Sequence, residues 1–475
     1  MTLPEDFLHN ILPVLKSEEH EAFLESLTAE NRQVSIRLNK KKATFEELPS
    51  HEELTPVGWC SEGYYMQQRP TFTADPLLHA GGYYVQEASS MFLSHCLRSV
   101  AKQPVHYLDL CAAPGGKTTL AISSLPEGSQ VVCNEIDRKR ARILAENVCK
   151  WGSPYVSVTS NAPADFAALR NTFDIILTDV PCSGEGMFRK DDAAISDWSL
   201  QKVEECCKLQ HKILDDIWPT LKPGGILIYS TCTFNISENE KMLEYICKQL
   251  GAEAIEIPIE QNWHIHPPLV GDLPCYRFMP HFTRGEGLFM AVVRKNGDMG
   301  SNAPKFKDKG KGKGNNKQSK DKPLLSLKEI EKQTQLWTRG MTSESYHLEI
   351  TNNETLHAIP ESHYSLHSAL KSAGLFLLSS GIELASIKGR DLIPAHALAL
   401  SQHLSPEAFP RIDVDYATAL SYLRRETINL PETVERGYVL VCYQNHPLGF
   451  VKNLGNRCNN LYPQEWRIRH ISGNE

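Results

Sequence analysis

Between Tyr107 and Lys295, short apolar runs rich in β-branched residues alternate with longer segments whose apolar residues recur at helical spacing. The clearest strand patterns are HYLDLCA, SQVVCNEI, YVSVTS, FDIILTDV and GILIYSTC, and KTTLAISSL, RKRARILAENVCKWG and LQKVEECCKLQHKILDDIWPTL have a helical pattern. This alternation is typical of a parallel sheet covered by helices. The sequence therefore predicts a doubly wound α/β domain. An antiparallel edge formed by the runs AEAIEIPI and GLFMAVVRK would close its sheet.

The segments on either side of this domain follow other patterns. The N-terminal part contains helical stretches and one strand-like run, VSIRLNK, which is too little for a second catalytic unit. Near the C-terminus a helical run, LSLKEIEKQTQLW, precedes the β-like runs GYVLVCYQ, HPLGFVKNLG and EWRIRHI, which turn residues separate. We predict five parts: an N-terminal extension (1–80), the α/β domain (81–296), a linker (297–323), an intermediate segment (324–399) and a small β-rich module (400–475).

The predicted linker contains KFKDKGKGKGNNKQSKDK, where Lys alternates with Gly, Asn and Asp and nothing apolar follows Phe306. This composition is typical of a solvated, flexible spacer. The tract is either such a spacer or a loose contact for nucleic-acid phosphates, and the sequence leaves both open.

Composition and charge narrow the class of protein. With 41% apolar and 23% charged residues, the chain has the balance of an ordinary globular protein. It contains no run near the ~20 apolar residues that span a bilayer and no signal-peptide pattern. We therefore expect a cytoplasmic protein without membrane contact, and a monomer. The net charge of −7 argues mildly against a nucleic-acid partner, but a bulk total does not exclude a local basic groove.

The thirteen cysteines are odd in number and scattered through predicted strands and helices, so a disulfide framework is not expected. No C-x-x-C pair occurs, and we predict no metal site. Only a cysteine with special surroundings deserves a chemical role.

A candidate cofactor loop is the segment LDLCAAPGGKTT, which places two glycines between a predicted strand and a helix. Backbone there can approach a ligand closely, although the segment fits neither G-x-G-x-x-G nor the P-loop spacing. The helix N-terminus beside Gly115 and Gly116 would favour a carboxylate, such as that of S-adenosylmethionine. The next strand ends at Glu135, which we assign to ribose hydroxyls, whereas Asp137 suits the start of the following helix.

Two cysteines stand where predicted strands end. Cys182 closes the segment Asp-Val-Pro-Cys after FDIILT, and Cys232 lies in Ser-Thr-Cys-Thr after GGILIY. The carboxyl ends of parallel strands form the ligand crevice, so the glycine loop, Glu135, Asp179 and both cysteines should converge there.

Methylation of a pyrimidine ring carbon requires such a set. Carbon 5 of cytosine is a poor nucleophile until a thiolate adds to carbon 6, and a base must later remove the proton at carbon 5. A carboxyl at ring nitrogen 3 would make carbon 6 more electrophilic, and we assign this role to Asp179. No metal is required, and the chemistry leaves Cys182 and Cys232 interchangeable.

Five segments, in order, resemble the motifs of the RNA cytosine-5 methyltransferases, the family of the bacterial 16S rRNA enzymes RsmB and RsmF and the eukaryotic NSUN enzymes. The resemblance covers about residues 30–295 and implies a Rossmann-like, S-adenosylmethionine-dependent methyltransferase domain that modifies carbon 5 of a cytosine in RNA. The segments are CAAPGGKTT (111–119), DVPCSGEG (179–186), KPGG (222–225), YSTCTFNISENE (229–240) and PHFTRGEGLF (280–289).

The same resemblance assigns roles that the chemistry leaves open. It implies that Cys232 is the nucleophile and that Cys182 assists release of the product. Where relatives usually carry an Asp for the adenine amine, this chain has Asn161, whose amide oxygen can still accept a hydrogen bond, and Asp165 is the alternative. The implied cofactor contacts are Cys111, Ala112, Ala113, Pro114, Gly115, Gly116, Lys117, Glu135, Asn161 and Asp179.

Both ends of the chain carry candidate RNA contacts. The tail LVCYQNHPLGFVKNLGNRCNNLYPQEWRIR resembles the PUA-type RNA-binding module of the RsmF subgroup, which implies 16S rRNA or the small ribosomal subunit as partner. At the other end, Arg37-Leu38-Asn39 matches an N-terminal family motif that either grips RNA or caps a strand, so residues 1–80 are interpreted as an RNA-binding extension. In the tail, Lys452, Arg457, Arg467 and Arg469 could meet phosphates, and Tyr462 or Trp466 could stack on a base unless Trp466 belongs to the core.

Two other functions fit the sequence less well. A tRNA cytosine-5 methyltransferase would carry the same catalytic motifs, and only the C-terminal module favours rRNA. A catalytically silent factor that binds ribosomal RNA would show a damaged motif, and none of the motifs is damaged.

Overall fold

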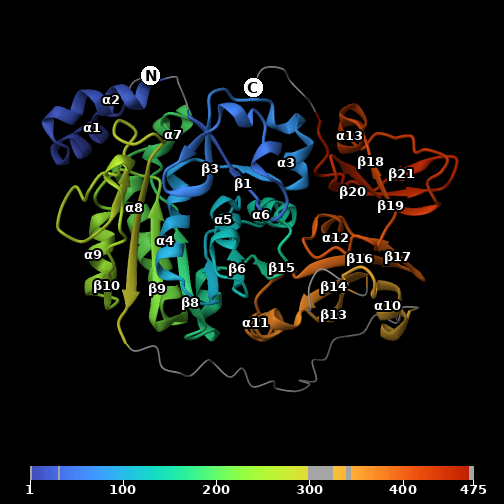
Figure 1. Ribbon diagram of the computed structural model, residues 1–475. Helices are drawn as coiled ribbons and strands as arrows, with labels where there is room; N and C mark the ends of the chain where they lie inside the picture. The colour runs from blue at the N-terminus through green and yellow to red at the C-terminus, as the bar shows by residue number, and fades with distance from the viewer. Residues whose placement is uncertain (1–2, 30–32, 298–324, 339–343, 353, 470–475) are drawn as a thin grey trace.

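The computed structural model describes residues 3–29, 33–297, 325–338, 344–352 and 354–469. The predicted linker lies outside these residues apart from Gly297, so both of its interpretations stay open. The described strands form four sheets, and the largest is the centre of the molecule (Figure 1).

The central sheet confirms the predicted doubly wound α/β fold. Its order is β10-β12-β9-β8-β5-β6-β7-β15, with β11 paired to β12 at the side. The five strands from β9 to β7 are parallel, and β12, β10 and β15 are antiparallel to their neighbours, as the sequence predicts for the two runs after residue 250. The bounds are β5 (His106–Asp109), β6 (Gln130–Asn134), β7 (Val156–Thr159), β8 (Phe173–Asp179), β9 (Leu221–Thr231), β10 (Ala252–Ala254), β11 (Tyr276–Phe278), β12 (Leu288–Lys295) and β15 (Leu377–Ser380).

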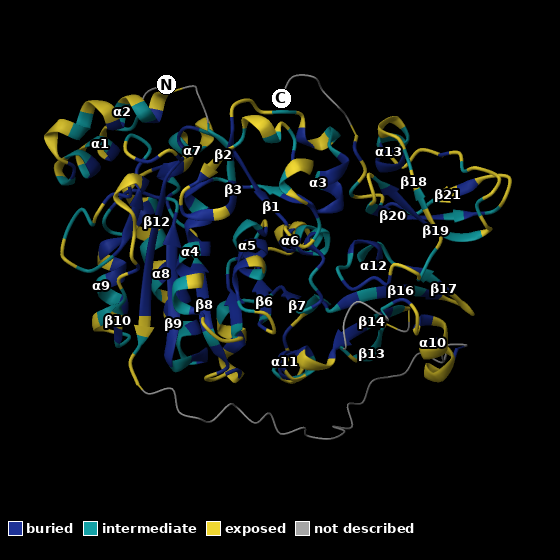
Figure 2. Cartoon of the chain, viewed as in Figure 1, coloured by how far each residue is buried: buried dark blue, intermediate teal, exposed yellow. Residues whose placement is uncertain are grey.

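Helices cover both faces of this sheet, and Figure 2 shows the strands between them as the most deeply buried part. Neighbouring residues of one strand, such as Tyr107 and Leu108, belong to opposite hydrophobic clusters, which explains why the strands are apolar throughout. One face carries α4 (Phe92–Val100), α5 (Gly116–Ser124) and α6 (Arg138–Trp151), and the other carries α8 (Leu200–Ile217), α9 (Glu240–Lys248) and α11 (Glu361–Ser372).

The last strand of the central sheet comes from the predicted intermediate segment. Strand β15 pairs with β7, and Leu366 and Leu370 of α11 are buried in the cluster beneath α8 and α9. The stretch 361–380, which contains α11 and β15, therefore packs as part of the α/β domain, whereas β13 and β14 just before it belong to another sheet.

The N-terminal part packs against two sides of the α/β domain. Helices α1 (Glu5–Ile11) and α2 (His20–Thr28) share a hydrophobic cluster with Phe188 and Trp198, near α7 (Asp192–Ser196). The four-stranded sheet β2-β3-β1-β4 follows, and its elements are β1 (Val34–Leu38), β2 (Thr55–Val57), β3 (Cys60–Met66), β4 (Tyr83–Val85) and α3 (Pro76–Ala80).

The motif Arg37-Leu38-Asn39 joins this sheet to the α/β domain. Arg37 is fully buried, donates to Gln86 and to Thr119 of α5, and stacks on the Trp151 ring. Asn39 donates to the backbone carbonyl oxygens of Gly81 and Trp151. The RNA-gripping interpretation of this motif is therefore wrong, because both polar side chains are buried and bonded inside the protein.

Two further sheets form the C-terminal half (Figure 1). One has the order β13-β14-β16-β17, and the other, β18-β19-β20-β21, lies against α3 of the N-terminal part. Their elements are β13 (Tyr346–Thr351), β14 (Thr355–Pro360), β16 (Ile382–Lys388), β17 (Asp391–Pro394), β18 (Arg411–Asp413), β19 (Gly437–Tyr443), β20 (His446–Asn453), β21 (Cys458–Asn460), α10 (Leu327–Thr334), α12 (His396–Leu400) and α13 (Tyr416–Leu423).

Two predictions for the tail are wrong. The run EWRIRHI forms no strand over its described residues 465–469, where Ile468 donates one backbone hydrogen bond to Leu423 and the last strand is β21 instead. Tyr462 is 1% exposed and cannot stack on RNA, while Trp466 packs at a right angle to the His396 ring, 4.9 Å away.

Among the helices that the structure describes, none has the length and apolar character needed to cross a membrane.

Candidate active site

The carboxyl ends of β5, β8 and β9 meet around a cavity of about 400 Å³. The structure brings most of the predicted site residues to its wall, while Cys182 lies behind Cys232 and Gly115, Glu135 and Asn161 lie outside it. The predicted residues on the wall are Cys111, Ala112, Ala113, Pro114, Gly116, Lys117, Asp179 and Cys232.

The two cysteines are in direct contact. Their sulfur atoms lie 3.3 Å apart, although 50 residues separate them in the chain. The hydrogen bond from Cys182 is the main cause that lowers the pKa of the Cys232 thiol, and the same bond with burial raises the pKa of Cys182 well above the ordinary value. These opposite shifts favour Cys232 over Cys182 as the sulfur that forms the thiolate.

A cation and a carboxylate share the floor of the cavity. Lys117 Nζ lies 2.8 Å from Asp179 Oδ2, and Ser230 donates to Asp179 Oδ1 over 2.6 Å. Burial alone would lower the pKa of Lys117, but the charge and hydrogen bond of Asp179 outweigh it and raise that pKa. The positive charge of Lys117 is thus retained, and it helps to lower the pKa of Cys232.

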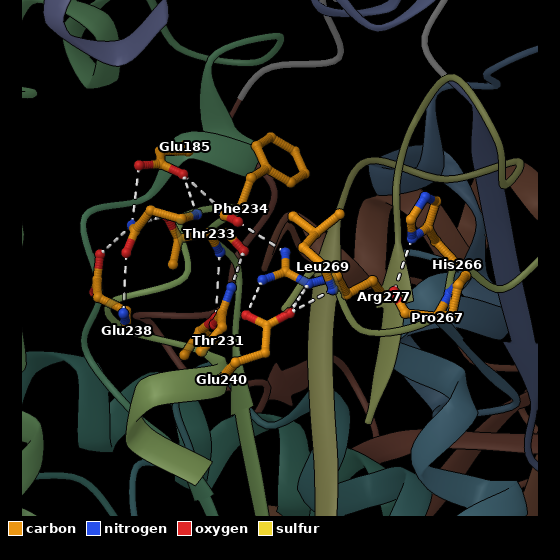
Figure 3. Close-up of polar contacts among 12 residues, drawn as sticks. Glu185, Thr231, Thr233, Phe234, Glu238, Glu240, His266, Pro267, Leu269 and Arg277 are labelled. Atoms are coloured by element: carbon orange, nitrogen blue, oxygen red, sulfur yellow. Dashed lines mark hydrogen bonds and ion pairs between the residues drawn. The ribbon is translucent and has the colours of Figure 1, made fainter. Parts of the chain in front are cut away.

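Two buried glutamates fix the loops that carry the cysteines (Figure 3). Glu185, on the Cys182 loop, accepts hydrogen bonds from the backbone N–H groups of Phe234 and Asn235 on the Cys232 loop, over 2.7 and 2.9 Å. In the opposite direction, Glu238 accepts the backbone N–H of Ser183 over 3.0 Å. Each loop therefore sends one carboxylate to the backbone of the other.

Further hydrogen bonds support Glu185 and Glu238, which we call the two straps between the cysteine loops. The Asn235 side-chain amide donates to both glutamates, and Gln210 of α8 donates to Glu238 over 2.7 Å. Behind them, Arg277 of β11 pairs with Glu240 and donates to the carbonyl oxygen of Phe234 over 2.7 Å (Figure 3). Both loops are thus held from several sides, which fixes the distance between the sulfurs.

Sequence reasoning missed these supporting residues. Glu185, Asn235, Glu238 and Glu240 all stand inside the motif segments DVPCSGEG and YSTCTFNISENE. A buried carboxylate needs several donors, but only the contact between two distant loops shows where those donors are. The remaining signal in the sequence is that one Glu stands close behind the Cys182 motif and two stand close behind the Cys232 motif.

The loop between β5 and α5 fits the methionine end of S-adenosylmethionine. Gly115 has a φ of +113°, and a Cβ there would lie 3.2 Å from the Leu144 side chain. Asp109, on the wall of the same cavity, is buried, and its Oδ1 has no hydrogen-bond partner among the described residues, while Thr118 donates to Oδ2. Desolvation raises the pKa of Asp109 to about 7. A buried carboxyl oxygen that lacks a donor suits an ammonium group, so the residues fit this ligand.

The structure gives Glu135 and Asn161 protein partners. Glu135, 3% exposed, accepts the backbone N–H of Asp137 and pairs with Arg140 at 3.2 Å. The Asn161 amide both donates to and accepts from the backbone of Phe376. The assignments of both to the cofactor stay predictions, and so does the alternative for Asp165, which accepts the N–H of Ala162.

Asp137 starts α6 as the sequence predicts. Its side chain accepts the backbone N–H groups of Lys139 and Arg140 at the beginning of the helix. This carboxylate is therefore a helix cap rather than a ligand contact.

Three family models match the chain. "16S rRNA methyltransferase RsmB/F" matches residues 98–294, "N-terminal domain of 16S rRNA methyltransferase RsmF" residues 3–88, and "Methyltransferase RsmF PUA domain" residues 409–468.

Whole-chain relatives share the name "Ribosomal RNA small subunit methyltransferase F". The protein of Citrobacter koseri is 30% identical over 460 residues, covering 91% of this chain and 89% of the relative. That of an Enterobacter species is 28% identical over 481 residues, covering 97% and 95%.

Solved structures from Pyrococcus horikoshii share the fold of the catalytic part. A methyltransferase homolog protein superposes with a TM-score of 0.51 at 25% identity, covering 62% of this chain and 100% of that one. NSun6 in complex with SFG superposes with a TM-score of 0.53 at 20% identity, covering 62% and 99%.

Proposed function

The chain belongs to the 16S rRNA methyltransferase RsmB/F family and uses S-adenosylmethionine as its cofactor, and from this premise we propose that it methylates carbon 5 of a cytosine in 16S rRNA. The observation that carries the proposal is the pair of sulfurs 3.3 Å apart at the ends of β8 and β9, with the lowered pKa on Cys232. A thiolate in this place is the nucleophile that activation of a pyrimidine requires.

In the first step, the Cys232 thiolate adds to carbon 6 of the cytosine. As the sulfur–carbon bond forms, the electrons of the 5,6 double bond move toward ring nitrogen 3, which takes a proton from the Lys117–Asp179 pair. Carbon 5 then has the electron density of an enamine. Bound S-adenosylmethionine supplies the electrophilic methyl group that carbon 5 takes up.

Cys182 acts in the second half of the reaction. Its pKa is raised mainly by the hydrogen bond to the charged Cys232, and this cause disappears once the Cys232 sulfur is bonded to carbon. Cys182 can then release its own proton to solvent and, as a thiolate, take the proton from carbon 5, while ring nitrogen 3 returns its proton to the Lys117–Asp179 pair. The electrons of that carbon–hydrogen bond restore the 5,6 double bond, and Cys232 leaves as a thiolate.

Single substitutions test the two roles. Cys232→Ala is expected to abolish methylation and to form no covalent complex, whereas Cys182→Ala is expected to accumulate a protein–RNA adduct that survives a denaturing gel. Cys206→Ala, a half-buried cysteine of α8 outside the cavity, is the matched control and should behave like the wild type. An adduct formed by Cys232→Ala would reverse the assignment.

The RNA target needs a separate experiment. Bisulfite sequencing of rRNA and tRNA from cells with and without the gene identifies each cytosine whose methylation depends on this protein. A lost mark in 16S rRNA supports the proposal, a lost mark in tRNA favours the alternative substrate, and no lost mark favours the silent binding factor. Cytoplasmic location, a monomeric state and RNA contacts from residues 1–80 and 400–475 remain predictions.

A further inference from the structure

A second cavity adjoins the active-site cavity. Its volume is about 870 Å³, within the range of about 300–1,000 Å³ that ligand pockets have. Its far wall comes from the N-terminal part, including Gln33 and Arg69. The cavities share a wall, so a nucleotide next to a base bound in the first cavity lies within reach of the second. Both cavities are lined by Val85, Gln86, Glu87, Lys190 and Glu286.

Two cations stand on the wall of the second cavity. Arg69 is exposed and Lys190 half-exposed, and within the described ranges neither side chain makes an ion pair. Cations of this kind are available to phosphate groups, and such contacts position a nucleic acid without reading its sequence.

Glu286 stands where the two cavities meet, and it is 3% exposed. It forms an ion pair with Arg189 at 3.4 Å, but among the described residues no donor makes a hydrogen bond to either of its carboxylate oxygens. Its backbone N–H donates to Glu87, which also accepts from the N–H groups of Ser89 and Ser90. The backbone that carries Glu286 is thus fixed, while its carboxylate oxygens lack the hydrogen-bond donors that buried acceptors normally have.

We propose that the second cavity binds the nucleotide next to the target cytosine and that Glu286 selects a base with an exocyclic amine there. The inference rests on the proposed function, because the target cytosine must occupy the neighbouring cavity. A carboxylate only accepts hydrogen bonds, and the amines of adenine, cytosine and guanine donate them. Uracil has no exocyclic amine, and its one donor, the ring N3–H, stands between two carbonyl oxygens that the carboxylate repels. Arg69 and Lys190 hold the phosphates on either side.

The test measures the binding of short RNAs. Fluorescent single-stranded oligonucleotides with one cytosine differ only in the base on its 5′ or 3′ side, and S-adenosylhomocysteine replaces the methyl donor so that no turnover occurs. On one side, uracil should weaken binding about tenfold to a hundredfold relative to adenine, as one hydrogen-bonded base contact does. No base preference on either side, or no binding of any oligonucleotide, would overturn the proposal.

Glu286→Gln separates base selection from a structural role. An amide both accepts and donates, so this variant should bind the uracil oligonucleotide better than the wild type does and lose most of the discrimination. If Glu286 only braces Arg189, the substitution weakens all oligonucleotides equally, and the proposal fails. Thermal unfolding checks that the variant is folded.

Lys190→Ala gives a second reading that does not depend on the Glu286 variant. It should weaken every oligonucleotide alike and reduce the slope of binding against salt by about one, as the loss of one phosphate contact does. Lys208→Ala, an exposed lysine on α8, is the control and should leave the slope unchanged. An unchanged slope for Lys190→Ala contradicts the phosphate contact. Because all readouts are binding constants, a failure of cytosine-5 methylation itself would be seen separately, in the cysteine variants.

Discussion

At the scale of single residues, we propose that the hydrogen bond between Cys182 and Cys232 determines which sulfur attacks. The hydrogen bond between them lowers the pKa of Cys232 and raises that of Cys182. The charge of Lys117 also lowers the pKa of Cys232. Asp179 and burial oppose thiolate formation on Cys232, so the hydrogen bond from Cys182 is the contribution that decides the direction. The lowered pKa of Cys232 therefore depends on Cys182 before any substrate is bound.

This dependence predicts a shift in cysteine reactivity. In the wild type, Cys232 should react with iodoacetamide at a pH below that of an ordinary thiol, because its pKa is lowered. Cys182→Ala removes the donor, so the pH of half-maximal labelling should rise. Labelling is followed by mass spectrometry of the peptide that carries Cys232, with Cys206→Ala as control. An unchanged profile in Cys182→Ala would contradict this dependence.

Asp109 predicts a pH dependence of stability without ligand. Its pKa of about 7 when folded is above the ordinary value of 3.8, so the folded state holds this proton more tightly and loses stability as pH rises through 7. Between pH 5 and pH 8 this loss is about 3 kcal/mol at most. Asp109→Asn, which keeps an acceptor for Thr118, should reduce the pH dependence of the free energy of unfolding in urea. Equal pH dependence in both proteins would refute it.

At the scale of elements, the loops that follow β8 and β9, rather than the strands themselves, set the positions of the two cysteines. Strand pairing places Asp179 opposite Ser230, but Cys182 and Cys232 come later in irregular segments. The straps from Glu185 and Glu238 hold those segments together, and Gly186 donates its backbone N–H to the Cys232 carbonyl oxygen. Buried carboxylates thus hold together the two loops that carry the cysteines.

Glu238→Gln tests the straps. The new amide N–H₂ would face the donors from Ser183, Asn235 and Gln210, so at least one buried donor loses its acceptor. We expect the free energy of unfolding to fall by about 1–3 kcal/mol and methylation to fall with it. Urea denaturation measures the first effect. Glu204→Gln, which changes an exposed glutamate of α8, is the control and should alter neither the free energy of unfolding nor methylation. Full stability of Glu238→Gln would show that the strap is dispensable.

At the scale of the whole molecule, the segment 361–380, far along the chain, is part of the α/β domain. Strand β15 covers the edge of β7, the backbone of Phe376 is bonded to Asn161, and Leu370 lies in the core beneath α8 and α9. An uncovered β7 would expose a sheet edge as well as apolar surface. The α/β domain is therefore not expected to be stable when the chain ends before β15.

Coexpression tests this connection. Residues 1–297 and 325–475, produced as two separate chains, should copurify as one complex, because β15 and α11 complete the sheet and its core. Residues 1–297 alone should aggregate or unfold at lower denaturant concentration. Leu370→Asp in the second chain should disrupt the complex, whereas Glu407→Ala, on an exposed glutamate, should not. A stable, soluble first chain would contradict the prediction.

The parallel strands, their order of appearance and the strand-end position of both cysteines could be read from the sequence. Strands buried on both faces are apolar throughout, and turn residues mark where they end. Strand β15 could not be read, because LLSS has four residues and its pairing with β7 is set by a contact more than 200 residues away. EWRIRHI misled for the opposite reason, since it has a strand pattern but its described residues 465–469 form no strand.

The sequence by itself determined the residue types, the fold class and the edge of the sheet where Asp179, Cys182 and Cys232 gather, because these follow from local hydrophobic patterns and from the geometry of parallel sheets. Only the tertiary structure decided that the sulfurs touch, that Arg37 and Tyr462 are buried, and that Asn161 binds the C-terminal segment. These facts depend on contacts between residues far apart in the chain. Burial and hydrogen-bond partners are properties of such contacts, and no local pattern encodes them.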